Sequence, residues 1–133
     1  MKNVFYWSPC LSKIGTLKST INSAISLSRY GKNEFNVKIL NACGEWDEYK
    51  NEFKKNDIEV IDLFKIKYFN YLPKTGFIKS RFSYLIIFIF SFLALLKIVS
   101  KKNPECLIVH SLTSFPLFLL YIFRFKTKFI LRI

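Results

Sequence analysis

The first twenty residues constrain the fold more than any other stretch of the chain. Asn3–Trp7 is a short apolar run of residues that favour strands. Ser8-Pro9 ends the run, because proline has no N–H to donate to a β-ladder. Gly15 then permits a turn or a close approach of the backbone to a ligand, and hydroxyl residues from Thr16 onward open a helix. A strand that leads into a helix through a glycine-bearing loop is typical of an open α/β sheet, whose ligands bind at the carboxyl ends of the strands.

The remaining hydrophobic pattern extends that sheet. Segments that alternate between strand and helix character are joined by short loops, which predicts parallel strands with right-handed crossovers. A chain of 133 residues fits one domain with a real core. We therefore predict an α/β fold, a three-layer Rossmann-like domain with about five parallel strands. The predicted strands are Asn3–Trp7, Asn36–Ala42, Ile58–Leu63, Glu105–His110 and Lys128–Ile133, and the predicted helices are Thr16–Tyr30, Glu45–Lys55, Arg81–Lys102 and Pro116–Phe125.

The net charge of +12 is concentrated in the second part of the chain. Up to Asp62, nine Lys and Arg residues accompany eight Asp and Glu residues, whereas from Leu63 onward twelve accompany a single acid, Glu105. A basic region with long apolar runs is typical of proteins that bind anionic lipid, a phosphorylated ligand or nucleic acid. An ordinary solvated basic surface explains the same pattern.

The segment Phe64–Ser80 interrupts the alternation of strands and helices with lysines and aromatic residues. Irregular connections of this length usually cover or bind something. Such a run can stack nucleic-acid bases, but the sequence carries no nucleic-acid-binding motif. We predict instead a surface that faces a membrane or a lipid-linked acceptor, with Lys65, Lys67, Lys74, Lys79 and Arg81 as its cations.

Phe82–Val99 is apolar apart from Ser83, Tyr84, Ser91 and Lys97. As a helix it would be about 27 Å long, which is just enough to cross a bilayer. The lysine within it, the basic residues on both flanks and its position in the middle of the domain favour a helix that packs against the sheet and touches a membrane surface. A membrane-spanning helix is the alternative.

No residue set forms a recognised catalytic or metal-binding motif. The three cysteines are an odd number without Cys-x-x-Cys spacing, which indicates reduced thiols in a cytosolic protein, and the N-terminus predicts no signal peptide.

His110, the only histidine, has either a structural role or a ligand-binding one at the end of its strand. Glu45, Asp47 and Glu48 fit a solvated helix start better than a catalytic carboxylate pair. We expect no metal site, and there is no P-loop or G-x-G-x-x-G motif.

Several of these features together resemble family 4 glycosyltransferases. Trp7-Ser8-Pro9 followed by Gly15-Thr16 and a helix rich in Ser, Ala and Leu is similar to the opening of these enzymes. So is a strand that ends in Ile108-Val109-His110-Ser111, followed by an apolar helix and Phe129–Ile133. The family has the two-domain GT-B fold and includes many bacterial transferases that build lipopolysaccharide O-antigen, capsule and other surface glycans. The resemblance covers residues 1–133 as the N-terminal, mainly acceptor-side domain.

The resemblance implies roles for five residues. Lys13, Gly15 and Thr16 would lie in the loop that faces the inter-domain cleft and would bind substrate. His110 would lie at the carboxyl end of the fourth strand as the catalytic residue, hydrogen-bonded to a sugar. Arg132 would bind substrate from the last strand. Many relatives have two adjacent glycines in the first loop, whereas an isoleucine precedes Gly15 here, which weakens the expectation of tight contact with a diphosphate.

The resemblance also implies an activity and its partners. The expected reaction is retaining and metal-independent, and transfers a sugar from a nucleotide sugar, a co-substrate rather than a cofactor, to a lipid-linked glycan. The expected location is cytoplasmic, peripheral at the inner face of the plasma membrane, on an anionic membrane surface and without nucleic acid. The family's nucleotide-sugar domain, with its pair of glutamates, would follow Ile133, so we expect a truncated chain that is inactive alone. The competing hypothesis is a small basic integral membrane protein that spans with Phe82–Val99 and has no enzymatic role.

Overall fold

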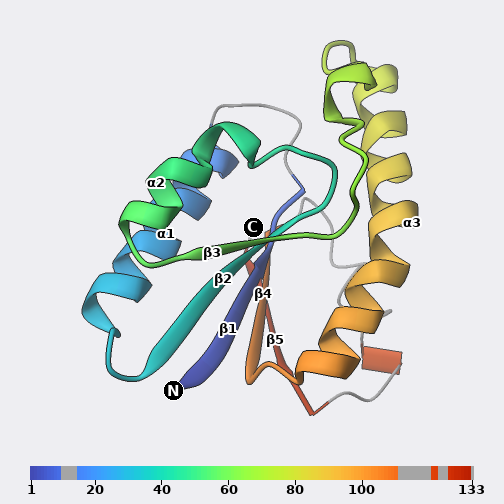
Figure 1. Ribbon diagram of the computed structural model, residues 1–133. Helices are drawn as coiled ribbons and strands as arrows, with labels where there is room; N and C mark the ends of the chain where they lie inside the picture. The colour runs from blue at the N-terminus through green and yellow to red at the C-terminus, as the bar shows by residue number, and fades with distance from the viewer. Residues whose placement is uncertain (10–14, 111–120, 123–125, 133) are drawn as a thin grey trace.

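The computed structural model describes residues 1–9, 15–110, 121–122 and 126–132. Within them, five strands form one sheet in the order β3-β2-β1-β4-β5, and each neighbouring pair is parallel (Figure 1). This confirms the predicted α/β fold with its parallel sheet. The strands are β1 (Lys2–Trp7), β2 (Phe35–Asn41), β3 (Glu59–Asp62), β4 (Cys106–His110) and β5 (Lys128–Arg132).

Helices cover both faces of the sheet. One face carries α1 (Thr16–Tyr30) and α2 (Lys50–Lys55), and the other carries α3 (Phe77–Lys102) (Figure 1). Alternate residues of β1 divide between the two layers, because side chains along a strand alternate in direction. Val4 and Tyr6 pack in the core under α1 and α2, whereas Phe5 and Trp7 pack in the core under α3. The result is a three-layer domain.

The helix α3 packs against the sheet along one stripe, as its sequence predicts. Its buried residues recur every three or four positions, which is the helical period, and the side chains of Phe88, Leu95 and Val99 join Trp7 in one core cluster. The opposite side of α3 remains apolar but exposed. Its exposed residues include Phe77, Ile78, Phe82, Leu85, Ile89, Phe90 and Leu93.

By length and composition, α3 is the one helix in the described part of the chain that is apolar enough to cross a membrane, with a mean hydropathy of 2.4 over its best window. One third of that window, 33%, is buried inside the domain. A core helix of a soluble protein passes the same test, so this property alone does not distinguish a spanning helix from a packed one.

Two predicted boundaries are wrong. The connection predicted over Phe64–Ser80 contains a short 3-10 turn, η2 (Phe69–Tyr71), and ends earlier than expected, because α3 begins at Phe77 rather than Arg81. Gly76, with a φ of 92°, lets the extended chain turn into the helix. The sequence gives no helical signal for this first turn. Phe77 and Ile78 are 73% and 79% exposed and lie outside the set of buried residues that recurs every three or four positions along α3.

The predicted helix Glu45–Lys55 is also shorter than expected. It consists of a 3-10 turn, η1 (Asp47–Tyr49), followed by α2 from Lys50. Glu45 does not start a helix because its buried carboxylate accepts hydrogen bonds from the backbone N–H groups of Ala42 and Cys43, at 2.9 and 2.7 Å. The interpretation of Glu45 as part of a solvated helix start is therefore wrong. Of the predicted helix Pro116–Phe125, only residues 121 and 122 are described, and both are helical.

Candidate functional site

A cluster of polar side chains lies where β1, β4 and β5 end and α1 begins. Ser8 follows β1, His110 ends β4, and Arg132 ends β5 in register with His110. Thr20 reaches this cluster from α1. In the strand order β3-β2-β1-β4-β5, β1 and β4 are the neighbours between which the direction of chain progression reverses. Open α/β sheets bind ligands at this switch point, at the carboxyl ends of the strands.

Hydrogen bonds tie the cluster together. The Thr20 hydroxyl oxygen lies 3.1 Å from Nδ1 of His110 and donates to the Ser8 hydroxyl oxygen at 3.4 Å. Thr20 and Ser8 are each 1% exposed, whereas His110 is half-buried. Burial lowers the pKa of His110, and the neighbouring positive charge of Arg132 lowers it further. The imidazole is therefore neutral at pH 7 and can accept or donate a hydrogen bond to a bound ligand.

The N-terminus of α1 lies at the same end of the sheet. Its N-cap is Gly15 rather than a hydroxyl residue, with a φ of 69° that favours glycine, and a side chain there would meet no atom of the described residues within 4 Å. Thr16 is the first residue of the helix. The first backbone N–H groups of a helix attract anions, which favours a polar ligand at this end of α1. The predicted substrate residue Lys13 lies outside the described residues.

A second, ionic cluster occupies the carboxyl ends of β2 and β3. The Asn41 side chain donates to Asp47 at 2.8 Å and to Asp62 at 2.6 Å. The Lys50 ammonium pairs with both carboxylates, at 2.8 Å from Asp47 and 3.0 Å from Asp62, and Lys67 pairs with Asp62 at 2.5 Å. Burial acts to raise the pKa of Asp62, but the hydrogen bonds from Lys67, Lys50 and Asn41 outweigh it, so the pKa is lowered.

This ionic cluster anchors the connection between β3 and α3 to the edge of the sheet. Lys67, one of the predicted membrane-facing cations, takes part in ion pairs, and its side chain is 32% exposed. The other four, Lys65, Lys74, Lys79 and Arg81, are exposed. The connection is also held by its backbone, because the N–H of Phe69 donates to the carbonyl of Cys43 at 3.0 Å.

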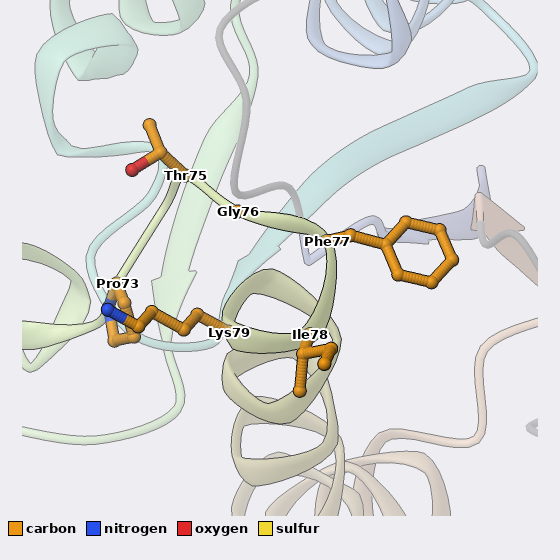
Figure 2. Close-up of a pocket in the computed structure, with 6 residues that line it drawn as sticks. All are labelled: Pro73, Thr75, Gly76, Phe77, Ile78 and Lys79. Carbon is orange, nitrogen blue, oxygen red and sulfur yellow. The ribbon is translucent and has the colours of Figure 1, made fainter.

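Exposed cations and aromatic residues gather where α3 begins. We call Lys74, Phe77, Ile78, Lys79, Arg81 and Phe82 the α3 start surface. The Lys74 ammonium lies 3.9 Å from the centre of the Phe69 ring, and the Arg81 guanidinium lies 3.9 Å from the centre of the Phe77 ring. A shallow hollow of about 540 Å³ lies at this point. In Figure 2, which draws the residues that line it, the side chains of Phe77 and Lys79 leave the start of the helix on opposite sides.

The α3 start surface lies at the same end of the domain as the His110 cluster. With 26 residues, α3 is roughly 39 Å long, whereas strands of four to seven residues span at most roughly 23 Å. The helix runs antiparallel to the strands, so its N-terminal turns project beyond their carboxyl ends (Figure 1). The α3 start surface and the switch point between β1 and β4 therefore lie at the same end of the domain.

The structure brings together some of the predicted site residues and adds two. His110 and Arg132 are neighbours, and Gly15 and Thr16 lie at the start of the helix that reaches them. Sequence reasoning missed Thr20 as the partner of His110, and Ser8 as the partner of Thr20. A signal was available, because a hydroxyl directly after β1 and another one turn into α1 both belong to the switch point of an α/β sheet. No group of three or more His, Cys, Asp or Glu side chains that could hold a metal ion occurs among the described residues.

Comparison with protein-family models and with curated proteins gives no match. Among solved structures, the chain is similar to the crystal structure of CalG4, the calicheamicin glycosyltransferase, with a TM-score of 0.60 and 12% sequence identity. The similarity covers 98% of this chain and 32% of that one, so the chain spans about a third of its length. At this identity the likeness establishes the fold. The chain therefore has the fold of the Rossmann-like half of a GT-B glycosyltransferase.

Proposed function

We propose that this chain is the N-terminal, acceptor-side domain of a GT-B glycosyltransferase of the family 4 type. The observation that carries the proposal is the placement of His110, with Thr20 and Ser8, at the switch point between β1 and β4. This is where an open α/β sheet binds its ligand. A neutral imidazole can form a hydrogen bond with a sugar hydroxyl group, and the guanidinium beside it can bind a phosphate, so together they suit a sugar phosphate. The fold match to CalG4 supports the same class of reaction.

The proposed reaction transfers a sugar, with retention and without a metal ion, from a nucleotide sugar to a lipid-linked glycan of a bacterial surface polysaccharide. In this proposal His110 is the catalytic residue that contacts the sugar, and Gly15, Thr16, Lys13 and Arg132 bind substrate. The 133 residues correspond to one of the two domains of such an enzyme. We therefore propose that a second, nucleotide-sugar-binding domain is required, and that the 133-residue chain transfers no sugar by itself.

An NMR titration tests the proposed ligand class. The ¹⁵N-labelled chain would be titrated with UDP-, GDP- and dTDP-sugars and with octyl glycosides as acceptor mimics. We expect saturable shifts at the amides of Gly15, Thr16 and His110 for at least one of these compounds. His110→Ala should weaken that binding about tenfold, the equivalent of one hydrogen bond. The control is Tyr30→Ala, at the far end of α1, where the side chain is 92% exposed.

Two results would contradict the proposal. If none of the nucleotide sugars or glycosides gives saturable shifts, the switch point does not bind sugar. If the shifts lie elsewhere and His110→Ala leaves the affinity unchanged, His110 has no role in binding. Separately, sugar transfer or nucleotide-sugar hydrolysis by the purified 133-residue chain would show that no second domain is needed.

We also propose that the domain is peripheral at the cytoplasmic face of the plasma membrane and binds anionic lipid through α3. The support is the combination of an exposed apolar helix face with the exposed cations of the α3 start surface. Apolar side chains that enter the lipid headgroup region and cations that meet anionic lipid reinforce each other. Because the surface lies at the same end of the domain as His110, a membrane bound there would face the end of the sheet that carries the candidate site.

Vesicle sedimentation tests the membrane proposal. We expect the chain to sediment with vesicles that contain phosphatidylglycerol and to remain in solution with pure phosphatidylcholine. The double substitution Lys79→Glu/Arg81→Glu should abolish sedimentation. The same charge change at Lys54 and Lys55, exposed residues of α2, is the matched control and should have a much smaller effect. Equal loss in both variants would mean that only net charge, and not the α3 start surface, drives binding.

A membrane-spanning protein is the second candidate, because α3 has the length and hydropathy of a transmembrane helix. The core contacts of Phe88, Leu95 and Val99 with the sheet argue against it. Extraction distinguishes the two. A peripheral domain leaves membranes in high salt or carbonate, whereas a spanning protein requires detergent.

A further inference from the structure

Thr20 stands out because it is a buried hydroxyl that links two elements of the candidate site. Its side chain is 1% exposed, and it lies between His110 at the end of β4 and Ser8 after β1. The Thr20 oxygen lies 3.1 Å from Nδ1 of His110 and 3.4 Å from the Ser8 oxygen. Hydroxyls this deeply buried are normally hydrogen-bonded, so the direction of each bond is chemically significant.

A hydroxyl group has a single hydrogen to donate. In this arrangement the Thr20 hydroxyl donates to the Ser8 oxygen. It must then accept, rather than donate, in its contact with His110. A neutral imidazole whose Nδ1 donates a hydrogen bond carries its proton on Nδ1 and leaves a lone pair on Nε2. The partner of one ring nitrogen thus determines what the other nitrogen can do.

We propose that Thr20 is a positioning residue that holds His110 as the Nδ1–H tautomer, so that Nε2 accepts a hydrogen bond from a hydroxyl group of the ligand. The inference rests on the proposed function only for the identity of that ligand, a sugar. An Nε2 acceptor excludes a phosphate oxygen from this position, because both atoms are acceptors. The adjacent Arg132, which shares the register of His110, is then the residue that meets a negative charge.

The charged and titratable surroundings of His110 are compatible with a neutral ring. Arg132 is its neighbour on β5, and its partner from α1 is the uncharged hydroxyl of Thr20, which in turn donates to the uncharged hydroxyl of Ser8 after β1. Burial and the Arg132 charge both lower the pKa of His110. At neutral pH the ring is therefore uncharged, and one of its two nitrogens carries the single ring proton.

The tautomer can be measured directly, because the chain contains one histidine. Long-range ¹H–¹⁵N correlation spectra of the ¹⁵N-labelled 133-residue chain at neutral pH report the protonation of each ring nitrogen without overlap. We expect Nδ1 in the protonated range and Nε2 in the unprotonated range. Thr20→Val, which replaces the hydroxyl with a methyl group of similar size, should move the ring to the mixed pattern of solvent-exposed histidine. Thr20→Ser should retain the wild-type pattern.

The control is the same substitution at an exposed threonine, Thr75→Val, which should leave the ring signals unchanged. A wild-type ring protonated on Nε2 would overturn the inference, and so would a Thr20→Val variant that keeps the Nδ1–H pattern. If Thr20→Val does not fold, as its backbone amide spectrum would reveal, the wild-type and Thr20→Ser spectra still decide the tautomer. No turnover or ligand is required, so failure here is separate from failure of the proposed function.

Discussion

The substitution of Leu95 by alanine tests the packing of α3 most directly. Leu95 is 0% exposed and lies in the core between α3 and the sheet. Leu93, two residues away on the same helix, is 72% exposed. In a helix surrounded by lipid the two leucines would be nearly equivalent, whereas in a helix packed on a sheet they are not. The pair therefore distinguishes a core helix from a spanning helix.

The size of the effect follows from the atoms removed. Leu→Ala removes three carbon atoms from the core, which costs about 2.4 kcal/mol in transfer free energy at about 0.8 kcal/mol per methylene. The cavity left behind adds to this, so we expect Leu95→Ala to lower the free energy of unfolding by about 3 to 4 kcal/mol. Leu93→Ala should change it by less than about 0.5 kcal/mol.

Urea denaturation provides the measurement. Trp7 contacts Phe88 of α3, with ring centres 6.0 Å apart, so its fluorescence reports on this interface. The second tryptophan, Trp46, reports on the opposite core layer, and circular dichroism reports on the helices. The change in midpoint multiplied by the m-value gives the free-energy difference. If both variants lose less than about 0.5 kcal/mol, α3 does not pack on the sheet through Leu95 and the assignment of its buried face is refuted.

Three further predictions concern the carboxyl end of the sheet. Because the folded-state pKa of Asp62 lies below its unfolded value of 3.8, its contribution to stability is present above that pH and is lost as the pH falls through the lower folded value. Asp62→Asn should destabilise the protein by less than about 1 kcal/mol at pH 7, and urea titrations should show the difference disappear in acid. Glu45→Ala removes the acceptor of two buried N–H groups and should lower the free energy of unfolding by about 2 kcal/mol or more in the same assay. Glu34→Ala is the exposed control, and a loss of stability no larger than that of the control would contradict the prediction. Burial raises the pKa of the Cys43 thiol, so mass spectrometry should find Cys43 unmodified by iodoacetamide in the native protein and modified in urea; native modification would place it at the surface.

The sequence predicted the fold because its strands and helices carry strong local signals. Strand β1 is a dense run of strand-forming residues, and α1 begins and ends where predicted, at Thr16 and Tyr30. Helix α1 ends before Gly31, where a side chain would lie 2.5 Å from a carbon of the Phe35 ring. The composition of β1 and the ends of α1 depend on residues that are close in sequence, so they can be predicted from the local sequence.

The side-chain clusters were harder to predict because they depend on strand order. Asn41 and Asp62 meet only because β2 and β3 are adjacent and in register, and Thr20 meets His110 across 90 residues of sequence. A sequence can identify His110 as a candidate, but it does not specify which hydroxyl contacts the ring. Glu45 was misinterpreted for a related reason. A glutamate that satisfies the backbone at the end of a strand has the same sequence signature as one at the start of a helix.

The central position of β1 has a consequence for how the chain folds during synthesis. On one side β1 pairs with β2, which follows soon after, but on the other side Val4 pairs with Cys106, 102 residues later. At typical rates of translation, roughly 5 to 20 residues per second, the second edge of β1 waits roughly 5 to 20 seconds for its partner. During that interval one of the most apolar strands of the protein exposes an unpaired edge, which is a template for aggregation. The nascent chain should therefore depend on ribosome-associated chaperones until β4 has been made.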